Sequence, residues 1–241
     1  MAGTKKATAA PDVRATLHNV EILGGRHLKR RILETMIDGS FEKPEIDAGL
    51  GCIKPGDRVI EMGAGSGTVG AILTKNIPDV QIMSFEANPN LLPAINELYA
   101  HNGLTDRNTV QNKAVVAGKD APKTIDFFVR KNFLGSRVFA ENNEPDVEEV
   151  KVKTIQYEKL RKDFRHNVLM MDIEGAELDF LRGADLSDVD LVIIELHRKV
   201  YHRPGMQECK RAFADQGFIL DEAHSKRSVF TYKKQNRIDA E

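Results

Sequence analysis

The sequence contains little cysteine and has no long apolar run. Its two cysteines, Cys52 and Cys209, lie far apart and form no CxxC pair, which argues against a disulfide framework and against a cysteine-based zinc site. No apolar stretch approaches the roughly 20 residues that span a bilayer, and the N-terminus lacks the apolar core of a secretory signal. We therefore expect a reduced, cytoplasmic protein that has no membrane partner.

The sequence also lacks an excess of charge of either sign. Its 35 lysines and arginines balance 36 aspartates and glutamates, which leaves a formal net charge of −1. Because these charges balance so closely, the molecule has no overall electrostatic field that would attract a polyanion, and we expect no nucleic-acid partner. The length of 241 residues fits one large domain.

Alternating strand and helix patterns begin near residue 57 and predict an α/β fold with a parallel sheet. We expect a disordered tail over 1–15, a helical segment over 16–50, a main domain over 51–234 and a second tail over 235–241. The predicted strands of the main domain span 58–62, 80–85, 109–116, 168–171 and 191–196, and the predicted helices span 68–76, 91–101, 176–182 and 206–215.

Two parts of the chain depart from the alternation of strands and helices, and each indicates a pair of neighbouring strands. Residues 124–129 and 147–154 both have strand patterns, with a polar loop between them, so we expect an inserted β-hairpin over about 123–154. Near the end of the chain, two strand patterns at 218–221 and 228–233 are joined by a short link, which predicts an antiparallel pair.

A glycine-rich turn follows the first predicted strand of the main domain and reads Glu61-Met62-Gly63-Ala64-Gly65-Ser66-Gly67. Glycines there allow a tight turn and let backbone N–H groups approach a ligand at the carboxyl ends of parallel strands. Gly65, Gly67 and Gly70 also satisfy the dinucleotide fingerprint, which is weak by itself. Glu86, at the end of the second strand, is placed to hold ribose hydroxyls in either case.

Two residue-level features favour S-adenosylmethionine over a dinucleotide. Glu61 lies at the end of the first strand, where a dinucleotide enzyme has no need of a carboxylate, and where a carboxylate can approach a cationic amino-acid group. The antiparallel pair predicted at the end of the chain is also typical of the seven-stranded sheet of class I methyltransferases.

A later segment, Met171-Asp172-Ile173-Glu174-Gly175-Ala176-Glu177, resembles the D-I/V-E-G-A-E signature of the FkbM family of S-adenosylmethionine-dependent O-methyltransferases. The resemblance extends over roughly Lys54 to Lys233. It includes Leu181-Arg182-Gly183-Ala184, the strand that contains Glu195, the stretch from Phe85 to Pro89 with Ala87 where proline is usual, and Asn112-Lys113-Ala114-Val115.

This resemblance implies a Rossmann-like class I methyltransferase fold, whose mostly parallel seven-stranded sheet has a C-terminal antiparallel strand and an inserted hairpin. It implies S-adenosyl-L-methionine as the cofactor and methyl transfer to a hydroxyl of a small molecule or glycan. We expect the cofactor to be bound by Glu61, Gly63, Ala64, Gly65, Gly67, Glu86, Ala87 and Asp172.

Methyl transfer to a hydroxyl requires a base, and Asp172, Glu195 and His197 are the candidates, with His197 or Asp172 preferred. Asp172 and Glu195 are also possible ligands of Mg²⁺, although we favour a site without a metal. A homodimer is compatible with the sequence. Two alternatives stay open: an NAD(P)-dependent oxidoreductase that uses the Gly65–Gly70 fingerprint, and a non-catalytic module that binds S-adenosylmethionine.

Overall fold

A seven-stranded sheet forms the centre of the molecule in the computed structural model, which describes residues 11–130 and 147–239. The strand order is β11-β12-β10-β9-β3-β4-β5. β12 runs antiparallel to β10 and β11, and the other neighbours are parallel. This arrangement confirms the predicted fold class. The strands are β3 (Arg58–Met62), β4 (Gln81–Phe85), β5 (Asn108–Gln111), β9 (Val168–Met171), β10 (Leu191–Glu195), β11 (Phe218–Leu220) and β12 (Val229–Lys234).

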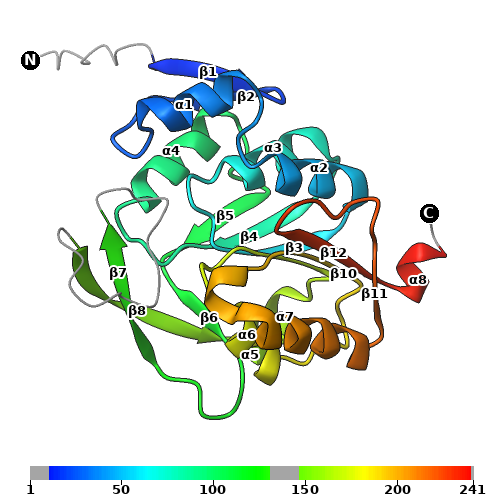
Figure 1. The fold of residues 1–241 in the computed structure, drawn as a ribbon. Coiled ribbons are helices and arrows are strands. Elements are labelled where there is room, and N and C mark those ends of the chain that lie inside the picture. The colour runs from blue at the N-terminus through cyan, green and yellow to red at the C-terminus, as the bar shows by residue number, and fades with distance from the viewer. Residues whose placement is uncertain (1–10, 131–146, 240–241) are drawn as a thin grey trace, which may run out of the picture.

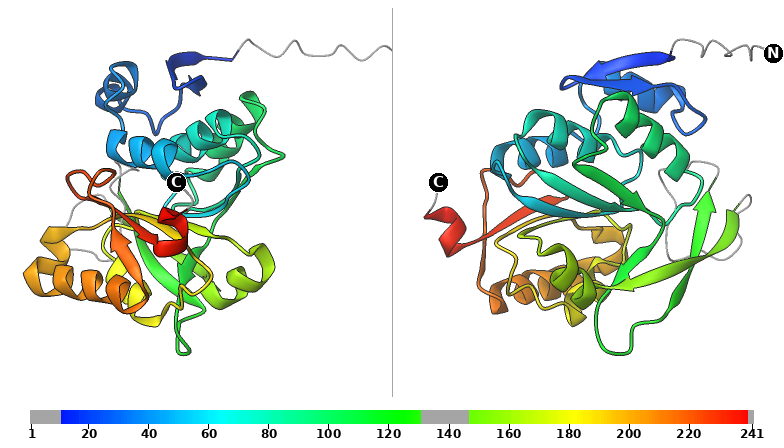
Figure 2. Two further views of the ribbon diagram at one scale, coloured as in Figure 1. Left: turned by 90° about the vertical axis from the view of Figure 1, so that its right-hand side faces the viewer. Right: turned by 180° about the vertical axis from the view of Figure 1, so that it is seen from behind.

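Helices cover both faces of this sheet (Figures 1 and 2). On one face lie α2 (Lys43–Cys52), α3 (Thr68–Asn76) and α4 (Leu92–His101); on the other lie α5 (Tyr157–Phe164), α6 (Glu177–Gly183) and α7 (Arg198–Asp215). The central strands are apolar and buried on both sides, as helix layers on both faces require. Among the described residues, no helix is both long and apolar enough to cross a bilayer.

The inserted segment forms a second, three-stranded sheet beside the first (Figure 1). β7 (Thr124–Arg130) and β8 (Val147–Gln156) pair antiparallel, as predicted, and β6 (Ala114–Val116) pairs parallel to β8. The prediction of one strand over 109–116 was wrong, because the chain leaves the central sheet after β5. Asn112 marks the break: its side chain donates hydrogen bonds to the carbonyl oxygens of Glu86 and Ala87. The loop predicted over 131–145 lies outside the described residues.

A β-hairpin precedes the helices at the N-terminal end, formed by β1 (Val13–Leu17) and β2 (Val20–Leu23). The prediction of a tail through residue 15 and of a helical segment from residue 16 was therefore wrong over this hairpin. Leu17, Val20 and Ile22 alternate with exposed residues and are buried in the same apolar core as α3 and α4. Helices begin only with α1 (Arg30–Ile37), and residues 1–10 lie outside the description.

The C-terminal end is also ordered, because residues 235–238 form a short helix, α8 (Gln235–Ile238). Its Arg237 is only 5% exposed and forms an ion pair with Asp57, which lies just before β3. The same guanidinium donates to the carbonyl oxygen of Cys52 at the end of α2, and it lies 3.3 Å from Asp190 Oδ1. The predicted tail over 235–241 was thus wrong up to residue 239.

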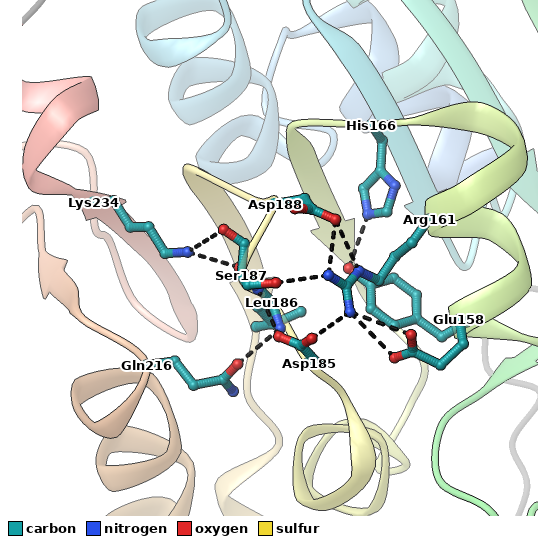
Figure 3. Close-up of polar contacts among 10 residues, drawn as sticks. Glu158, Arg161, His166, Asp185, Leu186, Ser187, Asp188, Gln216 and Lys234 are labelled. Atoms are coloured by element: carbon teal, nitrogen blue, oxygen red, sulfur yellow. Dashed lines mark hydrogen bonds and ion pairs between the residues drawn. The ribbon is translucent and has the colours of Figure 1, made fainter.

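A second arginine connects α5 to the loop that leads into β10 (Figure 3). Arg161 pairs with Asp185, Asp188 and Glu158 and donates to the Ser187 hydroxyl. Its own side chain is 11% exposed, whereas the three carboxylates are about half exposed or more. Both arginine clusters join segments that are far apart in the sequence. The Asp57 partner of Arg237 is buried, whereas the Asp185 and Asp188 partners of Arg161 are exposed.

Candidate active site

A cavity of about 350 Å³ opens at the carboxyl ends of β3, β4, β9 and β10. This is the edge where open α/β sheets bind ligands, and the volume falls in the range of small-molecule sites. Helix α2 and the inserted sheet complete its wall. Lys113 is the one lysine or arginine among the described lining residues, whereas eight lining residues are acidic: Glu42, Glu45, Glu61, Glu86, Asp172, Glu174, Asp179 and Glu195.

The glycine turn forms one wall of the cavity, to which Gly63, Ala64 and Gly65 all contribute. Gly63 has φ +88°, and a Cβ at this position would lie 1.8 Å from the carbonyl oxygen of Asp172. Only glycine fits there, because the turn after β3 packs directly against the backbone that leaves β9. The turn after β3 and the segment that follows β9 are therefore in direct backbone contact at Gly63.

Glu61 and Glu86 are both buried, with 4% and 6% exposure. The Ser84 hydroxyl donates to Glu61, whereas Glu86 accepts hydrogen bonds from the backbone N–H groups of Gly65 and Asn88, both at 2.7 Å. Burial raises the pKa of each carboxyl to about 7, and these hydrogen bonds oppose the rise. Both predicted residues thus face the cavity beside the glycine turn, and a positively charged or hydroxyl-bearing ligand would satisfy them.

The last two glycines of the dinucleotide fingerprint have packing roles. Gly67 lies outside the described cavity lining, and a Cβ there would meet Ile95 at 2.7 Å. A Cβ at Gly70 would lie 2.8 Å from the Glu61 carboxylate. Gly67 thus does not line the cavity with the other predicted cofactor residues. The contacts with Ile95 and Glu61 explain Gly67 and Gly70 of the Gly65–Gly70 pattern without a pyrophosphate.

The turn that follows β9 is held by the carboxylate of Glu177, which is fully buried. It accepts hydrogen bonds from the backbone N–H groups of Ile173 and Gly175 and from the Tyr201 hydroxyl. Burial would raise the pKa of Glu177, but its hydrogen bonds with His197 and Tyr201 outweigh burial and lower it. A glutamate in the first turn of a helix stabilises the helix through its dipole. Glu177 does more than this, because its hydrogen bonds also hold the turn that follows β9.

Asp172 lines the cavity, and His197 lies behind it, outside the described lining. The Nδ1 atom of His197 is 3.2 Å from Glu177 Oε1, and its Nε2 atom is 3.7 Å from Asp172 Oδ1. Burial lowers the pKa of His197, but the hydrogen bond to Glu177 and the negative charges of Glu177, Asp172 and Glu174 raise it to about 9. His197 is therefore a cation at neutral pH in this site.

The Oδ1 atom of Asp172 is inaccessible to solvent and has no hydrogen-bond partner among the described residues, although His197 Nε2 lies 3.7 Å from it. Burial, followed by the charges of Glu195 and Glu174, raises the pKa of Asp172 well above its ordinary value, and His197 acts in the opposite direction. Glu195, the third predicted catalytic residue, also lines the cavity and accepts a hydrogen bond of 2.7 Å from the Ser228 hydroxyl.

One group of three possible metal ligands occurs at this site within the described chain, namely Asp172, Glu177 and His197. Glu195, which the sequence suggested as a partner of Asp172 for Mg²⁺, is not part of it. The carboxylate of Glu177 already accepts hydrogen bonds from backbone and from Tyr201. Glu177 therefore has little capacity left for a metal ion.

Sequence reasoning missed the contribution of α2 to this cavity. Glu42, at the N-cap of α2, and Glu45, one turn later, both line the cavity. Ile125 and Phe127 of β7 contribute apolar surface from the inserted sheet. The spacing of Glu42 and Glu45 places them on one helix face, but no local pattern shows that this face covers a cavity formed more than a hundred residues later.

The strand order with its antiparallel β12 and the cavity at the strand ends define a Rossmann-like α/β protein with the sheet topology of class I methyltransferases. A family model described as the methyltransferase FkbM domain matches residues 63–220, well over half of the chain. The chain belongs to the FkbM methyltransferase family. A comparison with curated proteins found no match.

Several solved structures are similar to this chain at low sequence identity. A precorrin-6y C5,15-methyltransferase from Geobacter metallireducens is 10% identical, with 81% of this chain and 89% of that chain covered and a TM-score of 0.48. A ribosomal protein L11 methylase from Lactobacillus delbrueckii subsp. bulgaricus is 14% identical, with 82% and 80% covered and a TM-score of 0.45. A SAM-dependent O-methyltransferase from Thermotoga maritima is 13% identical, with 80% and 65% covered and a TM-score of 0.45. At these identities the likeness concerns the fold alone.

Proposed function

We propose that this protein is an O-methyltransferase that moves the methyl group of S-adenosylmethionine to a hydroxyl of a small molecule or glycan. The observation that carries the proposal is the pairing of two buried carboxylates, Glu61 and Glu86, with the glycine turn on one side of the cavity. A third carboxylate, Asp172, lines the same cavity from the end of β9. Glu61, Glu86 and the glycine turn suit a cationic nucleoside, and Asp172 is suited to accept a proton.

The chemistry of these residues fits the cofactor. Glu86 supplies two carboxylate oxygens for ribose hydroxyls and already holds the backbone of Gly65. Glu61 supplies a negative charge for the cationic amino-acid end, and Gly63 lets the backbone approach closely. Ala64 and Ala87 add uncharged surface beside them. A positive charge in this space would favour the ionised forms of Glu61 and Glu86, whose pKa values burial raises to about 7.

Asp172 is the residue that we assign as the general base. It lines the cavity, and its raised pKa makes its carboxylate a stronger proton acceptor than an exposed aspartate. His197 stands behind it as an imidazolium held by Glu177, so its positive charge stabilises the ionised form of Asp172. Glu195 adds negative charge from the neighbouring strand.

The reaction is an in-line displacement in which the cofactor supplies an electrophilic methyl group on a sulfonium. The acceptor oxygen must be held about 3–3.5 Å from that carbon, on the side opposite the sulfur. Asp172 takes the hydroxyl proton as the new C–O bond forms and the C–S bond breaks. No covalent bond to the protein is formed in this scheme.

Two experiments test the proposal. Calorimetric titration should show S-adenosylhomocysteine binding and no binding of NAD(P)H, and Glu86→Ala should weaken that binding at least about tenfold, since it removes both ribose acceptors. Cell extract incubated with the protein and S-adenosylmethionine labelled in its methyl group should yield a labelled compound by mass spectrometry. Binding without any label transfer would instead support the non-catalytic module.

A further inference from the structure

The cavity carries more negative charge than the proposed cofactor contacts use. Glu61 and Glu86 serve the cofactor in that proposal, which leaves Glu42, Glu45 and Glu195 on the same cavity wall as Asp172. Glu174 and Asp179 also line the cavity, but Glu174 lies 3.4 Å from His197 Nε2 and Asp179 pairs with Arg182, so neither belongs to the surplus. This surplus lies at the side that α2 and the ends of β9 and β10 form together.

Glu42 and Glu45 come from a helix that precedes the part of the chain matched by the family model. Glu42 is half-buried, and after burial the largest influence on its carboxyl is the negative charge of Asp172, so its pKa is raised. Burial raises the pKa of Glu45 to about 7, and the charge of Glu195 adds to this rise, whereas a backbone hydrogen bond and the charge of Arg227 oppose it. The carboxylates that line this side of the cavity therefore repel one another, and a cation among them would relieve this repulsion.

The spread of these carboxylates favours an organic cation over a metal ion. A bound Mg²⁺ or Ca²⁺ requires oxygens that converge to about 2.0–2.6 Å from one point. Over the part of the chain that the structure describes, the groups of possible ligands within 4.8 Å of one another do not include Glu42, Glu45 or Glu195. An ammonium group on a larger molecule can instead interact with several separate carboxylates.

Asp172 is a second feature at this end of the cavity. Its side chain lines the cavity and is 36% exposed, whereas its Oδ1 atom is turned away from solvent, lies 3.7 Å from His197 Nε2 and has no hydrogen-bond donor among the described residues. The exposed part of this carboxylate can therefore accept a hydrogen bond from a hydroxyl bound in the cavity.

We propose that the methyl acceptor is a hydroxyl compound that also carries a protonated amine, as an amino sugar does, and that Glu42 and Glu45 recognise its charge. This inference rests on the proposed function. The hydroxyl faces Asp172 and loses its proton there, whereas the ammonium group lies toward α2. A neutral or anionic acceptor would leave the repulsion among Glu42, Glu45 and Glu195 without relief.

The test reads the charge of the labelled compound. An extract of the organism's own cells that lack the gene is incubated with the full-length protein and methyl-labelled S-adenosylmethionine, and the products are passed at pH 7 over cation- and anion-exchange resins. S-adenosylmethionine is itself a cation and binds the cation exchanger, so it is first separated from the products and identified by its mass. Retention of a labelled product on the cation exchanger supports the inference. Label that flows through both resins or binds the anion exchanger overturns it and leaves the proposed function intact, whereas the absence of any labelled product overturns both.

Paired variants then locate the recognition. Glu42→Gln and Glu45→Gln should each raise KM for the labelled acceptor about tenfold or more and leave the affinity for S-adenosylhomocysteine unchanged. The matched control is Asp47→Asn, which lies on the same helix, is exposed and pairs with Lys43. Equal KM values for all three variants would contradict the inference, as would label transfer that requires added Mg²⁺ and loses this requirement in Glu42→Gln.

Discussion

At the scale of single residues, Asp172 has the environment of a proton acceptor. Its carboxylate oxygen Oδ1 lacks a partner, and its pKa is raised by burial and by Glu195 and Glu174. Asp172→Asn keeps the shape of the side chain and removes the base. We expect the rate of label transfer in a single turnover to fall by about 10²- to 10⁴-fold, while the affinity for S-adenosylhomocysteine stays within about threefold.

The control for this prediction is Asp163→Asn, an exposed position on α5 whose partner is Lys159. It should leave both the rate and the affinity unchanged. A fall in affinity as large as the fall in rate would show that Asp172 serves binding and not proton transfer. A normal rate in Asp172→Asn would exclude it as the base and leave Glu195.

His197 gives the molecule a stability that depends on pH. Although burial lowers its pKa, Glu177, Asp172 and Glu174 raise it to about 9, above the ordinary value of 6.5. The contribution of the imidazolium is therefore complete below about pH 6.5 and is lost as the pH rises through 9. A shift of this size corresponds to at most about 3 kcal/mol, and the raised pKa of Asp172 opposes part of it.

The measurement compares the wild type with His197→Gln by urea unfolding at pH 6 and pH 10. The variant should be less stable than the wild type at pH 6, and the difference should shrink by about 1–3 kcal/mol at pH 10. If the difference is the same at both pH values, His197 does not form a charged pair with Glu177.

The sequence predicts single residues well where a local motif places them. Glu61, Glu86 and Asp172 end strands of a recognisable pattern, and all three line the cavity. The roles of Glu42 and Glu177 could not be predicted from a local motif. The role of Glu177 depends on Tyr201 and on backbone groups that only the folded turn brings together, and that of Glu42 depends on the packing of a distant helix.

At the scale of elements, the turn after β3 and the turn after β9 are fixed against each other by Gly63. Gly63→Ala should strain a φ of +88° and also place Cβ against the carbonyl of Asp172. Gly56→Ala is a matched control, because its φ of +82° is similar and nothing lies within 4 Å of its Cβ. We expect the control to lose about 1–2 kcal/mol, and Gly63→Ala to lose about 1–3 kcal/mol more.

Thermal unfolding and binding of S-adenosylhomocysteine measure the two effects separately. The control should bind the ligand normally, whereas Gly63→Ala should bind it at least about tenfold more weakly, because the turn that faces the cavity must move. Equal loss of stability in the two variants would mean that the contact with Asp172 costs little to displace.

Periodicity predicts the elements of the central sheet because burial on both faces gives each strand an apolar run with turns at its ends. It fails where a strand changes partners. Residues 109–116 have one continuous strand pattern, but Asn112 lets the chain pass from the central sheet to the inserted one. It also misses the hairpin of β1 and β2, whose strands are short and pair only with each other.

At the scale of the whole molecule, segments outside the family domain complete the site. Helix α2 supplies Glu42 and Glu45 to the cavity, and its last carbonyl, that of Cys52, accepts a hydrogen bond of 2.6 Å from Arg237 in α8. The C-terminal helix thus anchors the helix that faces the acceptor. No sequence pattern indicates this link, because Arg237 and Asp57 are 180 residues apart.

The two arginine clusters predict different costs of removing an arginine. Arg237→Ala leaves Asp57, which is 7% exposed, without its cation, and losing one partner of a buried pair costs about 3–5 kcal/mol. Arg161→Ala leaves carboxylates that are mostly exposed to solvent, and it should cost about 1–2 kcal/mol. Urea unfolding at pH 7 measures both values, and a larger loss for Arg161→Ala would contradict the ranking.

The pH dependence of stability distinguishes the ion pair of Arg237 with Asp57 from the packing contacts of Arg237. Burial would raise the pKa of Asp57, but hydrogen bonds from Arg237, Asn167 and the backbone of Lys54 outweigh it, so the pKa lies below the ordinary value of 3.8. Asp57 therefore contributes stability above about pH 4 that is lost as the pH falls through its lowered pKa. The difference between the wild type and Arg237→Ala should shrink at about pH 3, because protonated Asp57 no longer needs a cation. A difference that persists at that pH would assign the loss to the packing of α8 against α2, and not to the ion pair.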